Sequence, residues 1–165
     1  MLGKFERVLE ALAGSNVDFV IVGGVAVVMH GHLRMTNDLD LAVDLTERNL
    51  ERCLGCLADL GYQPQAPVDM MAFADADQRQ RWVTEKNMTV FSLWSSDRSG
   101  PTVDLFADPP FDYHQLKRRA VTVSLAGHDV SVVSLDDLVA MKQAVGRPQD
   151  LADVLSLKQI DDRDP

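Results

Sequence analysis

The sequence predicts an α/β (α+β) fold in which helices pack against a mixed β-sheet. An almost continuous run of β-forming apolar residues at 17–22 leads directly into Gly23-Gly24, as a buried strand ending in a tight turn does. Further strand-like segments alternate with amphipathic helical ones, and two helical segments end the chain. This order suits one mixed sheet flanked by helices, with a C-terminal helix pair.

In the N-terminal half, helices are predicted over 2–14, 25–30 and 46–60, and strands over 17–22 and 38–43. The long helices carry apolar residues at intervals of three and four, and Gly14 and Gly61 stand where the first and third end. The strand at 38–43 alternates between polar and apolar residues through its first four positions. The following stretch, 63–77, contains two prolines and is predicted to be a loop.

In the C-terminal half, a polar helix is predicted over 78–85 and strands over 88–94, 102–106, 120–125 and 130–133. Gly127-His128 between the last two strands favours a hairpin turn. Helices over 135–145 and 148–157 complete the chain, since Gly146 separates them and Pro148 suits the first turn of the second.

Length and composition predict a single globular domain over residues 1–165, because 46% of the residues are hydrophobic and 25% are charged. Cys53 and Cys56 lie within an amphipathic helix, so we expect them to pack in the core. No apolar run approaches the roughly 20 residues of a membrane helix. The charged N-terminus is unlike a signal peptide, so a cytoplasmic protein without a membrane partner is expected.

The net charge is −9, from 16 Lys and Arg against 25 Asp and Glu. This balance argues against a protein that coats duplex nucleic acid, although it leaves room for a local basic groove. The one basic cluster, Lys117-Arg118-Arg119, is interpreted as a solvated turn that could alternatively meet RNA phosphate.

Two aspartates share the polar face of the strand at 38–43. Asp38 and Asp40 are two residues apart, so they point the same way with Cα atoms about 7 Å apart. Carboxylates so placed repel each other and suit a pair of divalent metal ions about 3.5–4 Å apart, the spacing of two-metal phosphoryl-transfer sites. Magnesium is expected, because oxygen ligands and substrate phosphate are its usual partners.

Asp104 repeats this geometry on the strand at 102–106, between Val103 and Leu105. If the two strands are neighbours, three carboxylates converge on one metal site. A solvated strand face would explain one Asp-X-Asp, but aspartate is a poor strand former, and three of them on inferred strands need a reason.

Gly23-Gly24 offers a complementary feature. Glycines between a strand and a helix let the backbone approach a ligand closely, and the helix N-terminus offers N–H groups to phosphate. A plain turn is the simpler interpretation of Gly-Gly alone. Placed about fifteen residues before the Asp-X-Asp strand, it favours metal-assisted transfer from a nucleoside triphosphate.

Lys142 falls on the apolar face of the helix at 135–145, together with Leu135, Leu138 and Val139. An inward lysine is costly unless its ammonium meets anions. A triphosphate would serve, and so would one of the aspartates. The alternative is a lysine whose stem covers the edge of the core while its ammonium reaches water.

The pattern Gly23-Gly24, a short helix, then Arg34-X-Thr36-X-Asp38-X-Asp40 resembles the nucleotidyltransferase superfamily that includes DNA polymerase beta. Within it, the chain is most similar to minimal nucleotidyltransferases related to the abortive-infection (AbiEii-type) toxins. The resemblance spans about residues 17–157. It extends to Asp104 as the third carboxylate, and to Leu138-X-X-X-Lys142 and Arg147-Pro148-X-Asp150-X-X-Asp153.

The resemblance implies transfer of a nucleoside monophosphate from an NTP to a hydroxyl acceptor, with release of pyrophosphate. Asp38 and Asp40 would bind two Mg²⁺ ions, and Asp104 would hold the ion nearer the acceptor hydroxyl. The residues implied to bind the nucleotide are Gly23, Gly24, Arg34, Thr36, Lys142 and Asp150.

Several of these residues also have purely structural explanations. Asp150 near the start of the last helix suits the helix dipole. Thr36 could support the carboxylate strand or touch phosphate, and Arg34 could be a surface charge. At position 24 most members of the superfamily carry serine. Glycine in its place indicates a resistance or toxin branch of the superfamily rather than a different class of protein.

Three functions remain open from the sequence. The first is a toxin-like nucleotidyltransferase acting on tRNA. The second is an enzyme that modifies a small cationic molecule such as an antibiotic, which the acidic net charge favours. The third is a non-catalytic, antitoxin-like binding partner, although three intact carboxylates count against lost catalysis. A partner protein or a homodimer would complete so open a site.

Overall fold

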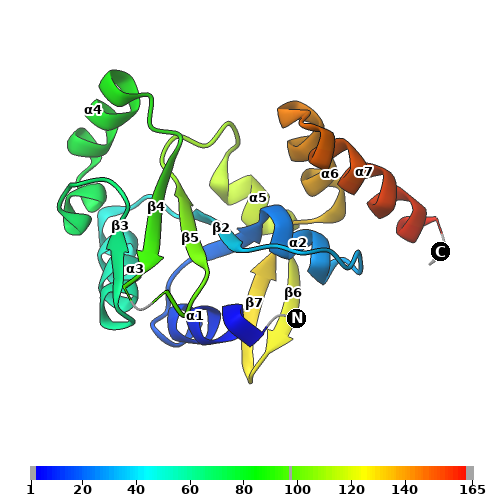
Figure 1. The fold of residues 1–165 in the computed structure, drawn as a ribbon, viewed down its shortest axis with the longest axis horizontal. Helices are drawn as coiled ribbons and strands as arrows, with labels where there is room; N and C mark the ends of the chain where they lie inside the picture. The colour runs from blue at the N-terminus through cyan, green and yellow to red at the C-terminus, as the bar shows by residue number, and fades with distance from the viewer. Residues whose placement is uncertain (1–2, 97, 163–165) are drawn as a thin grey trace.

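The computed structural model describes residues 3–96 and 98–162, which form one seven-stranded sheet with helices around it (Figure 1). The strands are β1 (Phe19–Val22), β2 (Asp38–Val43), β3 (Tyr62–Pro64), β4 (Val90–Ser95), β5 (Thr102–Phe106), β6 (Val121–Leu125) and β7 (His128–Val132). The helices are α1 (Gly3–Gly14), α2 (Gly23–Met29), α3 (Glu47–Asp59), the 3-10 helix η1 (Met70–Ala74), α4 (Ala76–Lys86), α5 (Tyr113–Arg119), α6 (Leu135–Val145) and α7 (Pro148–Asp161).

The sheet is mixed, as predicted, with the strand order β3-β4-β5-β2-β1-β7-β6. β2 pairs in parallel with β5, and β1 pairs in parallel with β7, whereas the other neighbouring strands are antiparallel. The two strands predicted to carry carboxylates are therefore adjacent at the centre of the sheet.

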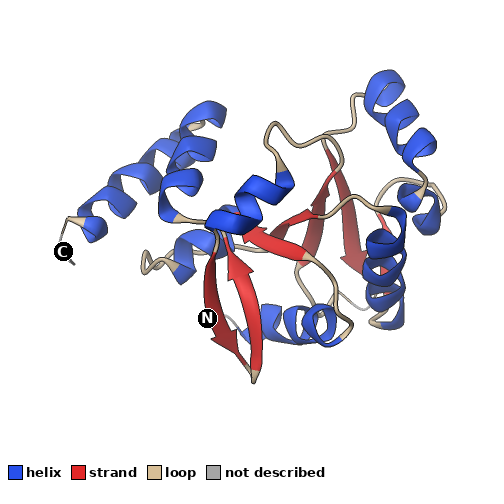
Figure 2. Cartoon of the chain, turned by 180° about the vertical axis from the view of Figure 1, so that it is seen from behind, coloured by secondary structure: helices blue, strands red, loops and turns tan. Residues whose placement is uncertain are grey.

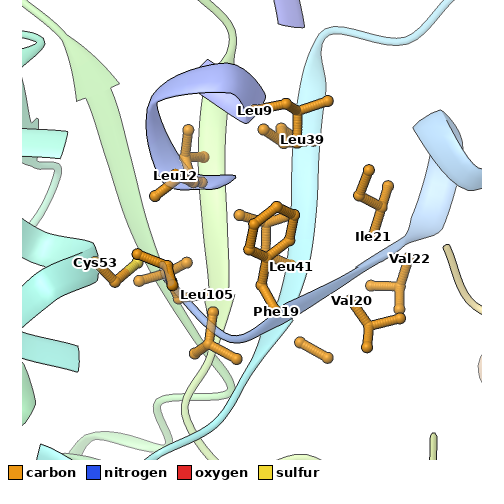
Figure 3. Packing of buried hydrophobic residues seen from close by; sticks show 14 of the residues in the cluster. Leu9, Leu12, Phe19, Val20, Ile21, Val22, Leu39, Leu41, Cys53 and Leu105 are labelled. Atoms are coloured by element: carbon orange, nitrogen blue, oxygen red, sulfur yellow. The ribbon is translucent and has the colours of Figure 1, made fainter. Parts of the chain in front are cut away.

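The core forms where α1 and α3 cover one face of the sheet. All four residues of β1 are buried, which explains their continuous apolar pattern. Figure 3 shows Leu9 of α1 beside Leu39 of β2, within the cluster that holds β1. Cys53 is buried in this cluster and Cys56 is partly buried, both as free thiols, so the expected core packing is confirmed.

The predicted loop at 63–77 is partly wrong, because it contains β3 and η1. β3 is a three-residue edge strand, too short to show a period, and Pro64 is tolerated at its end. In η1, Phe73 is fully buried and stacks on Phe91 with ring centroids 4.4 Å apart. Contacts with distant residues, rather than local periodicity, order this stretch.

The basic cluster at 117–119 lies in the last turn of α5 and is not a free turn. The helix begins where the Asp112 carboxylate accepts a 2.8 Å bond from the backbone N–H of Gln115. Lys117 Nζ donates to the Phe19 carbonyl at 3.2 Å, and Arg119 binds Asp137 through two nitrogens. Two of the three cations are therefore engaged within the fold.

The hairpin between β6 and β7 turns at Ala126-Gly127, one residue earlier than predicted. Both residues have positive φ, of 50° and 81°, which is the geometry of a type I′ turn.

The predicted C-terminal helix pair is present as α6 and α7, with Gly146 in the left-handed region between them. The pair lies at one end of the molecule and α4 at the other (Figures 1 and 2). Within the described residues, no helix has the length and apolar character to span a membrane.

Candidate active site

Three carboxylates share one face of the central strands. In the parallel β2–β5 ladder, Asp40 is the register partner of Asp104, and Asp38 is the partner of Thr102. On the opposite face of these strands, Leu39, Leu41, Val103 and Leu105 are completely buried in the core. Alternation along the two strands therefore directs the aspartates away from the core, and the two strands are neighbours, which was the condition for the three carboxylates to converge.

The turn after β1 brings the backbone against Asp40. Val22 is the antiparallel partner of Asp40, so the chain leaves β1 beside that carboxylate. Gly23 has φ +65°, and a Cβ there would overlap the Asp40 side chain. The backbone N–H of Gly24 donates a hydrogen bond to Asp40. A Cβ on Gly24 would lie 2.7 Å from Thr36 Oγ1, so a side chain at either glycine would displace a neighbouring side chain of the site.

Burial and mutual repulsion raise the pKa values of two of the aspartates, Asp40 and Asp104. Burial, followed by repulsion from Asp104 and Asp38, raises the pKa of Asp40 to about 6, although Gly24 and Lys142 oppose the shift. Burial also raises the pKa of Asp104, and a hydrogen bond from Ser92 opposes it. Asp104 Oδ1 is buried without a hydrogen-bond partner. The face thus holds concentrated negative charge and one unsatisfied carboxylate oxygen.

Lys142 lies in a buried cluster of ionic groups between α6 and α7. Its Nζ is 2.8 Å from Asp153 Oδ2 and 3.2 Å from Asp150 Oδ1. The ammonium is buried, so the interpretation in which it reaches water is wrong, and the anions that accompany it are aspartates of α7. Arg147 also contacts Asp150, at 2.8 Å, and with the Lys142 bond this lowers the pKa of Asp150.

The segment between α2 and β2 closes the site from another side. Arg34 Nε lies 3.3 Å from Asp153 Oδ1, and one terminal nitrogen donates to the Met35 carbonyl. Thr36 Oγ1 donates to the Asp38 carbonyl at 3.3 Å. Arg34 is therefore tied to α7, and Thr36 supports the start of the carboxylate strand.

These elements surround a cavity of about 450 Å³. Its lining includes every residue that the sequence predicted for the site: Gly23, Gly24, Arg34, Thr36, Asp38, Asp40, Asp104, Lys142 and Asp150. In the described part of the chain, no three His, Cys, Asp or Glu side chains form a ready-made metal cluster. The aspartates line the cavity as separate, mutually repelling groups.

Asp153 stands in the family motif quoted from the sequence but was given no role there, and Ser92 was not predicted for the site. Asp153 is completely buried, and its pairing with both Arg34 and Lys142 makes it the centre of the ionic cluster. Its spacing of three residues from Asp150 places both on one face of α7, which is the signal that could have found it. Ser92 carries no local signal, because its role follows from the pairing of β4 with β5.

The chain is also similar to known proteins. A family model described as "Nucleotidyl transferase AbiEii toxin, Type IV TA system" matches residues 7–164. No curated protein sequence gives a significant match.

Solved nucleotidyltransferase structures share the fold. The lincosamide antibiotic adenylyltransferase LnuA, bound to lincomycin, aligns with a TM-score of 0.65 at 13% identity, over 97% of this chain and 98% of that one. ANT(2″)-Ia in complex with adenylyl-2″-tobramycin gives 0.58 at 15% identity, over 94% and 86%. A putative nucleotidyltransferase from Thermotoga maritima gives 0.54 at 13% identity, over 95% and 94%.

Proposed function

The chain belongs to the AbiEii nucleotidyl transferase toxin family, and from this premise we propose that it transfers a nucleoside monophosphate from an NTP to a hydroxyl of tRNA. The acceptor hydroxyl releases its proton to water and its oxygen forms a bond to the α-phosphorus, while the bond from that phosphorus to the oxygen bridging to the β-phosphate breaks and pyrophosphate leaves. The observation that carries the proposal is the register pairing of Asp40 with Asp104 beside the Gly23 turn, in one cavity.

The donor set fits divalent metal ions. Asp38, Asp40 and Asp104 supply hard carboxylate oxygens, and the buried Asp104 Oδ1 has no other partner. Burial and then the charges of Asp104 and Asp38 raise the pKa of Asp40, and a bound cation would compensate the carboxylate charge. Magnesium ions held by these three residues would neutralise phosphate charge and lower the pKa of the acceptor hydroxyl.

The remaining residues divide between positioning and phosphate binding. Asp104 would lie nearest the acceptor hydroxyl. In the strand order β5-β2-β1 it is farther than Asp40 from the Gly23 turn, where the phosphates would bind. Arg147 lines the cavity with an exposed side chain, so it is placed to meet the triphosphate. Lys142 and Asp150 would hold α6 and α7 in place beside the nucleotide, with Arg34 linking them to the carboxylate strand.

A second candidate acceptor is a small cationic molecule, the class of acceptor named for ANT(2″)-Ia, where the product is adenylyl-2″-tobramycin. Four aspartates line the cavity, and the net charge of the chain is −9, which favours a cation over a polyanion.

We propose a cytoplasmic setting and a protein partner as well, since the matched family is a toxin of a type IV toxin–antitoxin system. A non-catalytic, antitoxin-like role is the third candidate, and intact carboxylates oppose it.

The test is incubation of the purified protein with each α-³²P-labelled NTP and Mg²⁺, offering total tRNA or an aminoglycoside mixture as acceptor. We expect label on tRNA, and none with Asp38→Asn or when the metal is chelated. Asp129→Asn is the matched control, because Asp129 is exposed on β7 outside the catalytic cavity. Label on the aminoglycoside alone would favour the second candidate. Magnesium-dependent NTP binding without any transfer would point to a missing partner.

A further inference from the structure

The carboxylate face of the sheet continues, uncovered, past the catalytic cavity. Ser92 of β4 is the register partner of Asp104 and hydrogen-bonds to its side chain, so the two lie on the same face. Trp94 lies two residues farther along β4 and shares that face. The partly exposed positions of β4 and β5 alternate with buried ones. A row of side chains therefore leads from Asp104 to Trp94 along an open surface.

A second cavity, of about 410 Å³, lies at the end of this row. It is lined by Gln65, Trp94, Ser95, Arg98, Gly100 and Thr102. Thr102 links it to the catalytic site, because Thr102 is the register partner of Asp38. The guanidinium carbon of Arg98 lies 5.8 Å from the centroid of the Trp94 ring. Among the described residues of its lining none is Asp or Glu, whereas four aspartates line the catalytic cavity.

We propose that Trp94 and Arg98 form the acceptor subsite, which stacks the unpaired terminal nucleotide of a single-stranded RNA end and presents its hydroxyl to Asp104. This subsite rests on the nucleotidyl transfer proposed above and specifies the acceptor. An aromatic ring stacks on any nucleobase, and a nearby guanidinium adds a cation–π contact or binds the adjoining phosphate. A polycationic small molecule would be repelled by the charge of Arg98.

The spacing suits one nucleotide. Trp94 is displaced from Asp104 by one strand and two residues, which is about 5 Å across the sheet and about 7 Å along it. A nucleotide stacked on Trp94 therefore has its sugar within reach of the carboxylates. The basic residues of α5 offer no comparable site, because Lys117 and Arg119 bind within the fold.

The test measures RNA and NTP binding separately. A fluorescent single-stranded RNA of six nucleotides with a free 3′-hydroxyl is titrated with protein and followed by anisotropy, and NTP binding with Mg²⁺ is followed by equilibrium dialysis. Trp94→Ala is expected to weaken RNA binding about ten-fold or more, and Arg98→Ala about three-fold or more. Trp94→Phe keeps an aromatic face and should bind nearly as the wild type does.

Arg81→Ala is the matched charge control, since Arg81 is exposed on α4 and its nitrogen contacts only Gln78 among the described hydrogen bonds. NTP binding should be unchanged in all four variants, because Trp94 and Arg98 do not line the catalytic cavity. If the wild type binds NTP but not RNA, or if Trp94→Ala and Arg98→Ala bind RNA normally, the subsite is refuted and the transfer reaction still stands. If the wild type binds RNA through Trp94 but no NTP, the proposed function fails and the subsite remains.

Discussion

The ammonium of Lys142 lies 2.8 Å from the carboxylate of Asp153, and neither side chain is more than 7% exposed. This pair joins α6 to α7, while the contact of Asp153 with Arg34 joins α7 to the segment before the carboxylate strand. One buried carboxylate thus holds together the walls of the proposed catalytic cavity that come from α6, from α7 and from the segment before β2.

Asp153→Asn should therefore destabilise the fold by about 3 kcal/mol, because it leaves Arg34 and Lys142 with less compensating charge inside the protein. Chemical denaturation measures the effect. Asp161→Asn, an exposed aspartate on the same helix, is the control and should change stability by less than about 0.5 kcal/mol. Equal stability of the two variants would show that the buried cluster does not contribute to folding.

Asp40→Asn should stabilise the protein at neutral pH while abolishing nucleotide transfer. The raised pKa of Asp40, about 6, means that the folded state binds a proton that the unfolded state has released. Stability is therefore lost as pH rises from about 4 to about 6. Replacing Asp40 removes this penalty, so we expect a gain of about 2 kcal/mol at pH 7.5, allowing for partial solvent screening, and none at pH 4.

Thermal and urea unfolding of Asp40→Asn across this pH range, without metal, measures the difference. Asp129→Asn serves again as the control, and its stability should follow the wild type in pH dependence. A loss of stability in Asp40→Asn at pH 7.5 would contradict the electrostatic account of the site.

Gly23→Ala should both destabilise the protein and eliminate activity. The residue would need φ +65°, which costs about 1 kcal/mol or more, and its Cβ would displace the Asp40 carboxylate. Gly55→Ala is the matched control, because in the middle of α3 no described atom outside the adjoining helix backbone lies within 4 Å of the added Cβ. That change should stabilise the helix by about 0.5–1 kcal/mol. Unimpaired transfer by Gly23→Ala would rule out a role for the close approach of the turn to Asp40.

Ser92→Ala should shift the pH dependence of transfer. The Ser92 hydroxyl donates to Asp104 and lowers its pKa, so its removal raises that pKa further. The acid limb of the kcat profile should then move to higher pH, with activity falling several-fold at pH 6 and recovering at pH 8. Ser124→Ala, on the exposed side of β6, is the control. A uniform loss of activity at every pH would indicate a structural effect of the substitution instead.

Much of the site could be predicted because its residues stand out from the pattern of their immediate neighbours in the sequence. The strand at 38–43 and the strand at 102–106 have the bounds that alternation predicts, since a period of two is a property of consecutive residues. The same alternation assigns each aspartate to the polar face. Two further residues also break a local pattern. Gly23 follows a buried strand directly, and Lys142 places a charge on an apolar helix face.

The sequence by itself therefore determined the fold class, nine of the residues that line the proposed catalytic cavity and the family to which the chain belongs. Only the tertiary structure decided which residues pair across the site. Asp153 meets Lys142 and Arg34, Ser92 meets Asp104, and Trp94 lies beside Thr102 because strands and helices far apart in the chain come together. Such contacts leave no period in the sequence, since they depend on sheet order and helix docking rather than on neighbouring residues.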